Sequence, residues 1–190
     1  MMTPDDVVGQ VTRALEALVG LPYDGEPVDQ LQHALQCAAL ARADGAKSDL
    51  VVAALLHDVA RSPQVADDPA DGAHANHGEQ GARWLEPLLG ARVAWLAAAH
   101  VDAKRYLVAT EPGYTAGLSE VSRRTLRAQG GAMTDAEQGA FAAHPWADDA
   151  VRLRRWDDLG KDPDADVAPI AAYAGEVRAV AAATGRRAGR

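Results

Sequence analysis

The sequence predicts an all-α fold arranged as a single helical bundle, and three observations support this expectation. The 190 residues are rich in alanine and leucine, and aromatic residues make up only 5%, which suits closely packed helices better than sheets. No segment shows the alternation of apolar and polar residues that marks a half-buried strand. Stretches rich in proline and glycine separate the apolar segments. We expect one domain over residues 1–190, with a core at about 4–175 and a flexible tail at 185–190.

Capping residues and chain breakers set the expected helix boundaries. Thr3 is suited to be an N-cap because Pro4 then takes the first helical position. Gly45 marks a natural C-terminus for the second helix, and either Ser48 or Asp49 is expected to cap the third. The expected helices span about 3–20, 28–44, 49–58, 77–89, 91–109, 117–129, 134–143, 145–160 and 167–184, with a polar loop over 62–76.

Composition and charge argue against several classes of protein. The formal net charge is −8, and apart from the arginine-rich end at 186–190 there is no basic stripe, so no nucleic-acid partner is expected. Cys37 is the only cysteine, which excludes an intramolecular disulfide and fits a reducing cytosol. No apolar run approaches the roughly 20 residues that cross a bilayer, and no signal peptide is visible. We expect a cytoplasmic protein, monomeric or weakly homo-oligomeric, with no membrane partner.

The dipeptide His57-Asp58 is the most informative chemical feature. It directly follows Leu50–Leu56, a run without a single polar residue, and a helix that is apolar on every side is buried. A buried carboxylate needs a partner, which a neighbouring imidazole alone rarely provides. Successive helical residues point about 100° apart, so the two side chains could serve two metal ions, with Asp58 as the bridge. The sequence therefore predicts a dinuclear metal site.

Four further residues fall on predicted inward faces of helices. His33 shares a face with Cys37, for example, and each such histidine alone is more often a hydrogen-bonded core residue. One metal site explains all the candidates together: His33, His57, Asp58, His77, His100 and Asp157. Imidazole and carboxylate ligands suit iron, manganese or zinc, and six ligands over two metals leave positions open for catalysis. His74 and His144 are expected to be solvated.

The order of these residues resembles the HD-domain superfamily, all-α metalloenzymes named after the dipeptide. The additional His77 and His100 resemble its dinuclear members. Longer segments are similar to the phosphonate-catabolism branch of that superfamily, so that the resemblance covers roughly residues 4–175. These segments are 26–36, 103–107, 117–119, 126–131 (LRAQGG) and 151–158 (VRLRRWDD).

The resemblance implies an O2-dependent oxidative cleavage of a C–P bond. The substrate would be a 1-hydroxy-2-(amino or trimethylammonio)ethylphosphonate, and the products phosphate and glycine or glycine betaine. The implied cofactor is a pair of iron ions, mixed-valent Fe(II)/Fe(III), with O2 as co-substrate. One iron would be bound by His33, His57, Asp58 and Asp157, and the other by Asp58, His77 and His100.

The resemblance also implies a phosphonate-binding set: Lys104, Ser122, Thr125 and Arg154. Lys104 lies one helical turn beyond His100, which directs its ammonium toward the same pocket. An arginine could offer a phosphonate a bidentate fork. Without the metal site, Lys104 and Arg154 would be interpreted as residues of solvated helix faces.

Three more residues complete the predicted site. In the family, a tyrosine and a glutamate at the positions of Tyr23 and Glu26 form a lid, in which the phenol occupies an open iron position until substrate displaces it. Glu26 is also expected to face the substrate's amino or trimethylammonium group. Tyr23, Glu26 and Lys104 are thus the predicted catalytic residues. Arg61 departs from the family, where a histidine often stands, and we expect it to contact the substrate.

Two other functions are compatible with part of the pattern. A metal-dependent HD phosphohydrolase acting on a phosphate ester would use the same ligands and basic pocket, but it would need no O2 and leaves Tyr23 and Glu26 unexplained. A non-catalytic binding or sensor domain would be expected to have an incomplete ligand set, whereas this set is complete.

Overall fold

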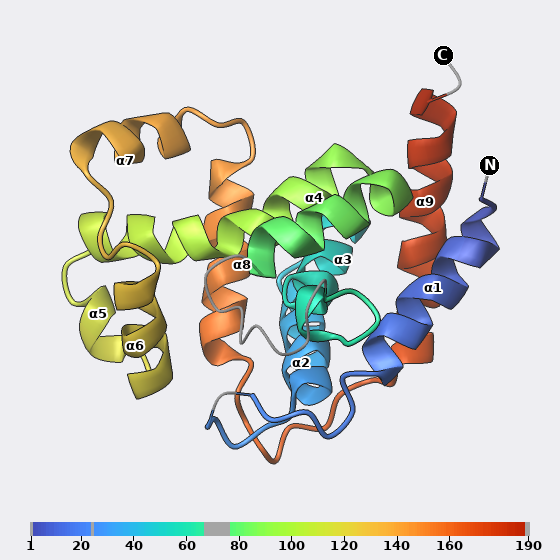
Figure 1. Cartoon of the computed structure of the whole chain (residues 1–190), viewed down its shortest axis with the longest axis horizontal. Coiled ribbons are helices and arrows are strands. Elements are labelled where there is room, and N and C mark those ends of the chain that lie inside the picture. Colours follow the sequence, from blue (N-terminus) through green and yellow to red (C-terminus); the bar gives the residue numbers. More distant parts are fainter. Residues whose placement is uncertain (1, 24, 67–76, 189–190) are drawn as a thin grey trace.

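The structure is a computed structural model that describes residues 2–23, 25–66 and 77–188, and it confirms the all-α prediction (Figure 1). No strand occurs within these ranges; an isolated antiparallel bridge joins Pro22 and Asp29. The helices are α1 (Pro4–Glu16), α2 (Gln30–Ala43), α3 (Ser48–Leu56), α4 (His77–Thr110), α5 (Tyr114–Gly117), α6 (Glu120–Ala128), α7 (Asp135–Ala142), α8 (Ala147–Leu159) and α9 (Ala174–Ala188), with 3-10 turns η1 (Val59–Arg61) and η2 (Ile170–Tyr173).

Four helices form the centre of the molecule. Helix α3 packs against α2, α4 and α8, and α4 packs along α8. Helices α1 and α9 pack against each other on one side, near both chain ends, while α5, α6 and α7 lie on the opposite side (Figure 1). Every residue from Leu50 to Leu56 is at most 2% exposed, which confirms the buried helix predicted from this apolar run. The end of α3 is therefore enclosed by protein on all sides.

Helix α4 is two helices that fold back on each other. Gly90 has φ 85° and ψ 165°, a non-helical conformation that divides the element where the sequence predicted a break. The two halves then lie side by side (Figure 1), and a Cβ placed on Gly78 would lie 3.1 Å from the carbonyl oxygen of Ala98. This hairpin brings His77, at its start, close to His100.

Several predicted boundaries were wrong. Helix α1 ends at Glu16, and a turn leads to Gly20, whose left-handed φ of 70° lets its N–H donate to Asp29. Neither Ser48 nor Asp49 caps α3: the N-cap is Lys47, which makes no side-chain capping bond. At the C-terminal end, regular helix begins only at Ala174, after a 3-10 turn, and continues to Ala188.

The N-cap predicted at Thr3 is confirmed. It is part of a capping box, in which the Thr3 side chain and the Asp6 carboxylate each accept the other's backbone N–H. No helix in the described part of the chain is both long and apolar enough to span a bilayer.

Gly90→Ala should destabilise the fold by about 1–3 kcal/mol, because its backbone lies in a region of φ and ψ that is essentially restricted to glycine. The added Cβ would also lie 2.9 Å from Thr184 Oγ1. Urea unfolding measures the loss. Gly139→Ala is the matched control, since nothing lies within 4 Å of its Cβ position and alanine favours a helix by about 0.5–1 kcal/mol. Equal stability of the two variants would contradict this account of the α4 hairpin.

Candidate metal centre

The two residues of the central dipeptide sit at the end of α3 rather than within it. His57 is the C-cap residue of α3, and Asp58 has φ −103° and ψ 17°, in the sparsely populated bridge region between helix and strand. The helical geometry assumed for Asp58 was therefore wrong. The Asp58 carboxylate nevertheless lies between two groups of ligands: Oδ2 is 3.6 Å from His57 Nε2, and Oδ1 is 3.2 Å from His77 Nε2.

The first group of candidate ligands comes from three helices. His33 of α2 lies with its Nε2 3.1 Å from His57 Nε2 and 3.4 Å from Oδ1 of Asp157 in α8. Asp58 Oδ2 lies 3.6 Å from His57 Nε2. Atoms bound to one metal at about 2.0–2.2 Å are about 3 Å apart, so the neighbouring pairs in this group are close enough for two atoms of each pair to bind one ion.

The second group is formed by the two halves of α4 with Asp58. His77 Nε2 and His100 Nε2 are 3.1 Å apart. Asp58 Oδ1 lies 3.2 Å from the former nitrogen and 3.7 Å from the latter. All three side chains are buried, and their ligand atoms lie close enough together to bind one ion.

Asp58 connects the two groups. One carboxylate oxygen faces His57, and the other faces His77 and His100. The latter oxygen, Oδ1, is buried and accepts no well-aligned hydrogen bond within the described residues. A buried oxygen without such a bond is costly unless a cation satisfies it. The donor set thus fits a pair of metal ions bridged by one carboxylate.

Backbone carbonyls fix the orientation of three imidazoles. The Nδ1 atoms of His33, His57 and His100 lie 2.8, 2.8 and 2.5 Å from the carbonyl oxygens of Gly160, Ala54 and Ala97 respectively. Such contacts require the proton on Nδ1 and leave Nε2 free as a metal ligand, as is usual for metal-binding histidines. All three Nε2 atoms point to the centre of the site.

Ionisation states in the site suit metal binding. Burial, together with the charge of His57, lowers the pKa of His100 to about 3, so this imidazole is neutral at pH 7. Burial opposes the charge of Asp58, but the surrounding histidines, His57 foremost, keep its pKa well below the usual value. Neutral imidazoles and ionised carboxylates are the forms that bind metals.

His33 differs from the other histidines in its protonation. Burial disfavours its charged form, yet Cys37 and the Asp157 carboxylate raise its pKa well above the ordinary value. A metal ion at this position would therefore displace a proton from His33, and metal binding should release protons to solution.

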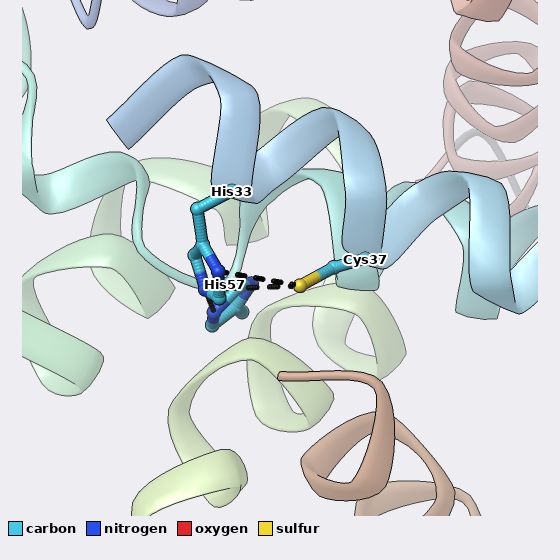
Figure 2. Close-up of side chains that lie close together, drawn as sticks. All are labelled: His33, Cys37 and His57. Carbon is cyan, nitrogen blue, oxygen red and sulfur yellow. Dashed lines mark hydrogen bonds between the residues drawn. The ribbon is translucent and has the colours of Figure 1, made fainter. Parts of the chain in front are cut away.

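Cys37 also lies beside the first group, one turn after His33 on α2 (Figure 2). Its sulfur is 3.7 Å from His33 Nε2, and its thiol donates to the carbonyl of Trp156 at 3.6 Å. Burial raises the pKa of this thiol, which disfavours the thiolate that metal binding requires. The sulfur and the ring nitrogens of His33 and His57 lie within 4.8 Å of one another, so Cys37 is within reach of the same ion, while Asp58 and Asp157 are the oxygen ligands expected from the sequence.

A cavity of about 40 Å³ adjoins the ligands. All seven residues that the sequence suggested for substrate contact or catalysis line it: Tyr23, Glu26, Arg61, Lys104, Ser122, Thr125 and Arg154. Asp58, His77, His100 and Asp157 line it too, so these seven side chains share one small cavity with the candidate metal ligands.

Lys104 is buried in the wall of this cavity. Its ammonium donates to Thr125 Oγ1 at 2.9 Å, and Thr125 in turn donates to the carbonyl of Ser122 at 3.1 Å. Burial lowers the pKa of Lys104 to about 8, with the nearby Arg154 acting in the same direction and the carboxylates of Asp157, Asp158 and Asp58 opposing it. Lys104 is thus a cation that titrates near physiological pH.

Arg154 is engaged with protein oxygens on all three of its nitrogens. Nη1 donates to Asp157 Oδ2 at 2.5 Å, Nη2 donates to Asp158, and Nε donates to Tyr114 at 3.1 Å. Asp157 points inward, as the helical spacing predicted, while Asp158 extends this ion-pair network instead of facing open solvent. Arg154 therefore positions a candidate ligand as well as lining the cavity.

Tyr23 and Glu26 cover the cavity from the loop before α2. The Tyr23 hydroxyl donates to Asp157 Oδ1 at 3.2 Å, and its ring stacks on His33 with centroids 4.0 Å apart. Burial, together with the charges of Asp157 and Asp58, raises the pKa of Tyr23 well above its usual value. The phenol is therefore protonated and lies on a candidate ligand of the first metal.

Sequence reasoning missed one charged residue of the cavity wall, Lys161, in the loop after α8. No periodicity or motif marked it, because it lies outside any helix. Of the two histidines expected to be solvated, His144 is half-buried and stacks on Trp95 with ring centroids 3.6 Å apart. His74 lies outside the described residues.

Comparison with known proteins shows which family the chain belongs to. The family model for the HD domain matches residues 31–138. A hydroxymethylphosphonate dioxygenase of Gimesia maris is 40% identical over 83% of this chain and 80% of its own length. The [1-hydroxy-2-(trimethylamino)ethyl]phosphonate dioxygenase (glycine-betaine-forming) of Leisingera caerulea is 37% identical over 75% of this chain and 74% of its own length.

A third relative is an uncharacterized protein of Acanthamoeba polyphaga mimivirus, 33% identical over 87% of this chain and 78% of its own length. The matched segment contains five of the six candidate ligands, from His33 to His100. Together with the helical fold and the His/Asp clusters, these matches show that the chain belongs to the HD-domain family, in the branch of the phosphonate dioxygenases.

Proposed function

We propose that the protein cleaves the C–P bond of a 1-hydroxyphosphonate with O2, at a pair of iron ions bridged by Asp58. The observation that carries the proposal is the position of Asp58, whose two oxygens face two different groups of histidines. Two metals bridged in this way at about 3.5–4 Å can act together on one bound substrate. The candidate substrates are hydroxymethylphosphonate and the 1-hydroxy-2-(amino or trimethylammonio)ethylphosphonates, which would give phosphate with formate, glycine or glycine betaine.

The electrons lost by the substrate in this reaction equal those gained by O2. Carbon 1 rises from the alcohol to the carboxylate level as it loses its bond to phosphorus, and it gives up four electrons. One O2 takes up these four electrons, and its two oxygen atoms are retained in the products. No external reductant is needed, which fits a 190-residue chain with no visible motif for a flavin or nicotinamide.

The residues of the cavity have separable roles. His33, His57, Asp58 and Asp157 would hold one iron, and Asp58, His77 and His100 the other; the bound irons would supply the activation of O2. Lys104, with the hydroxyls of Thr125 and Ser122, would bind the phosphonate oxygens. Arg154 would hold Asp157 in place. Tyr23 would cover the first metal until substrate binds, limiting access of water to the site.

Iron-loaded protein should release phosphate from a 1-hydroxyphosphonate only in the presence of O2. The experiment follows phosphate and the carboxylate product with and without air, and uses a phosphate ester as the control substrate. A hydrolase would act on the ester equally well without O2. Phosphate release from the 1-hydroxyphosphonate that continues anaerobically would rule out the proposed chemistry.

Asp58→Asn should lower the iron content from two ions per chain toward one or none and reduce turnover by more than about 10²-fold, because a neutral amide bridges cations poorly. Metal analysis and phosphate release are the measurements. Asp148→Asn, the same change at an exposed position in α8, is the control and should retain both irons. Two tightly bound irons in the Asp58→Asn variant would exclude Asp58 as an essential bridge.

Substrate affinity should fall as the pH rises through about 8, because Lys104 loses its proton there and with it the charge that attracts the phosphonate. Below that pH the ammonium is charged and affinity should reach a plateau. The pH profile of kcat/KM tests this, and Lys104→Arg, which remains charged, should abolish the alkaline decline. An unchanged decline in that variant would assign the titration to another group.

A further inference from the structure

Lys161 has no role in the site as described so far. Its ammonium lies 3.4 Å from Glu26 Oε1 and 3.4 Å from Ser122 Oγ. The side chains of Lys161 and Glu26 are only 13% and 12% exposed, so water screens this pair weakly compared with a surface ion pair. The pair also joins the loop after α8 to the loop before α2, across the cavity that adjoins the candidate ligands.

We propose that Lys161 determines substrate specificity: by neutralising Glu26, it selects a 1-hydroxyphosphonate that bears no ammonium group, such as hydroxymethylphosphonate. The inference rests on the proposed function and narrows its substrate class. Of the three carboxylates that line the cavity, Asp58 and Asp157 lie within the two ligand groups. Within the described residues, Glu26 is thus the lining carboxylate that remains to receive a cationic substituent. Its buried Oε1 accepts no well-aligned hydrogen bond, and the ammonium of Lys161 is the positive charge beside it.

The cationic side chains of the cavity wall strengthen this conclusion. Arg61, Lys104, Arg154 and Lys161 all line the cavity. These residues suit a phosphonate dianion, which needs positive charge. An ammonium two bonds from C1 would instead approach Lys161 when it approached Glu26, and like charges placed close together oppose binding.

Aromatic residues offer no alternative site for a quaternary ammonium. Such groups are recognised by the faces of several aromatic rings. Tyr23 is the one tyrosine, tryptophan or phenylalanine among the described residues that line the cavity, and its face already has Lys161 Nζ 5.9 Å from the ring centroid. Trp146 and Trp156 face Arg92 and Arg152 instead.

The size of the cavity points the same way. Its volume of about 40 Å³ corresponds to roughly three water molecules, at about 10–15 Å³ of such volume for each. Any substrate must fit into this space beside the Tyr23 side chain. A trimethylammonium arm would need a much larger displacement than hydroxymethylphosphonate, which carries no group on C1 beyond the hydroxyl and the phosphonate.

The test compares the dissociation constants of two ligands on iron-loaded, oxygen-free protein by calorimetry, so that binding is measured without turnover. The ligands are hydroxymethylphosphonate and 2-amino-1-hydroxyethylphosphonate. The wild type should bind hydroxymethylphosphonate at least roughly tenfold more tightly than the amino compound. A difference of this size corresponds to the repulsion between the substrate ammonium and one nearby lysine. Lys161→Gln should reduce this preference at least about tenfold, chiefly by tightening the amino ligand, whereas Lys161→Arg, which keeps the charge, should preserve it.

The outcomes separate the inference from the proposed function. A wild type that prefers the amino ligand, or a preference that Lys161→Gln leaves unchanged, overturns the role of Lys161. Equal weakening of both ligands in Lys161→Gln also overturns it, because the lysine would then be only a phosphonate contact. Iron content and helical circular dichroism confirm that each variant is folded and loaded. If the wild type consumes O2 with none of the three candidate 1-hydroxyphosphonates, the proposed function fails and this inference with it; turnover of the trimethylammonio compound alone overturns only the role of Lys161.

Discussion

The structure depends on one buried carboxylate. Asp58 is 6% exposed and reaches Nε2 atoms from two groups of histidines. Such a group is unfavourable in a protein interior unless positive charge compensates it. Its position follows from the backbone, because α3 ends at Leu56 and Asp58 leaves the helical conformation. An entirely buried apolar segment, Leu50–Leu56, thus leads directly to a carboxylate at the centre of the fold.

The rest of the bundle holds partners around that carboxylate. His57 and His100 use the same local device, in which Nδ1 bonds to the carbonyl three residues earlier, so each helix orients its own ligand. His33 instead uses the carbonyl of Gly160, from the loop after α8. A Cβ on Gly160 would lie 2.8 Å from the sulfur of Cys37; this close approach explains why glycine stands there. His57 and His100 are thus oriented by contacts within their own helices and His33 by a contact with a distant loop, and in all three imidazoles Nδ1 faces a backbone carbonyl.

The sequence predicted the helical class and the convergence of the candidate ligands, because both follow from apolar periodicity and from the order of His and Asp residues. The break at Gly90 was also predictable, since glycine interrupts an otherwise helical pattern. The contacts of Lys161 were not predictable, since they arise between loops that are 135 residues apart in the chain at Glu26 and Lys161. The conformation of Asp58 was equally hidden, because the local sequence resembles a continuing helix. The roles assigned to individual ligands remain predictions.

The central claim is that two irons lie side by side across Asp58, and X-ray absorption spectroscopy of iron-loaded protein tests it most directly. Iron–iron scattering at roughly 3.5–4 Å is the predicted result, and it should disappear when Asp58 is replaced by Asn. The sample must carry two irons per chain. A spectrum of that sample that shows nitrogen and oxygen ligands around each iron, but no second iron nearby, would contradict the account.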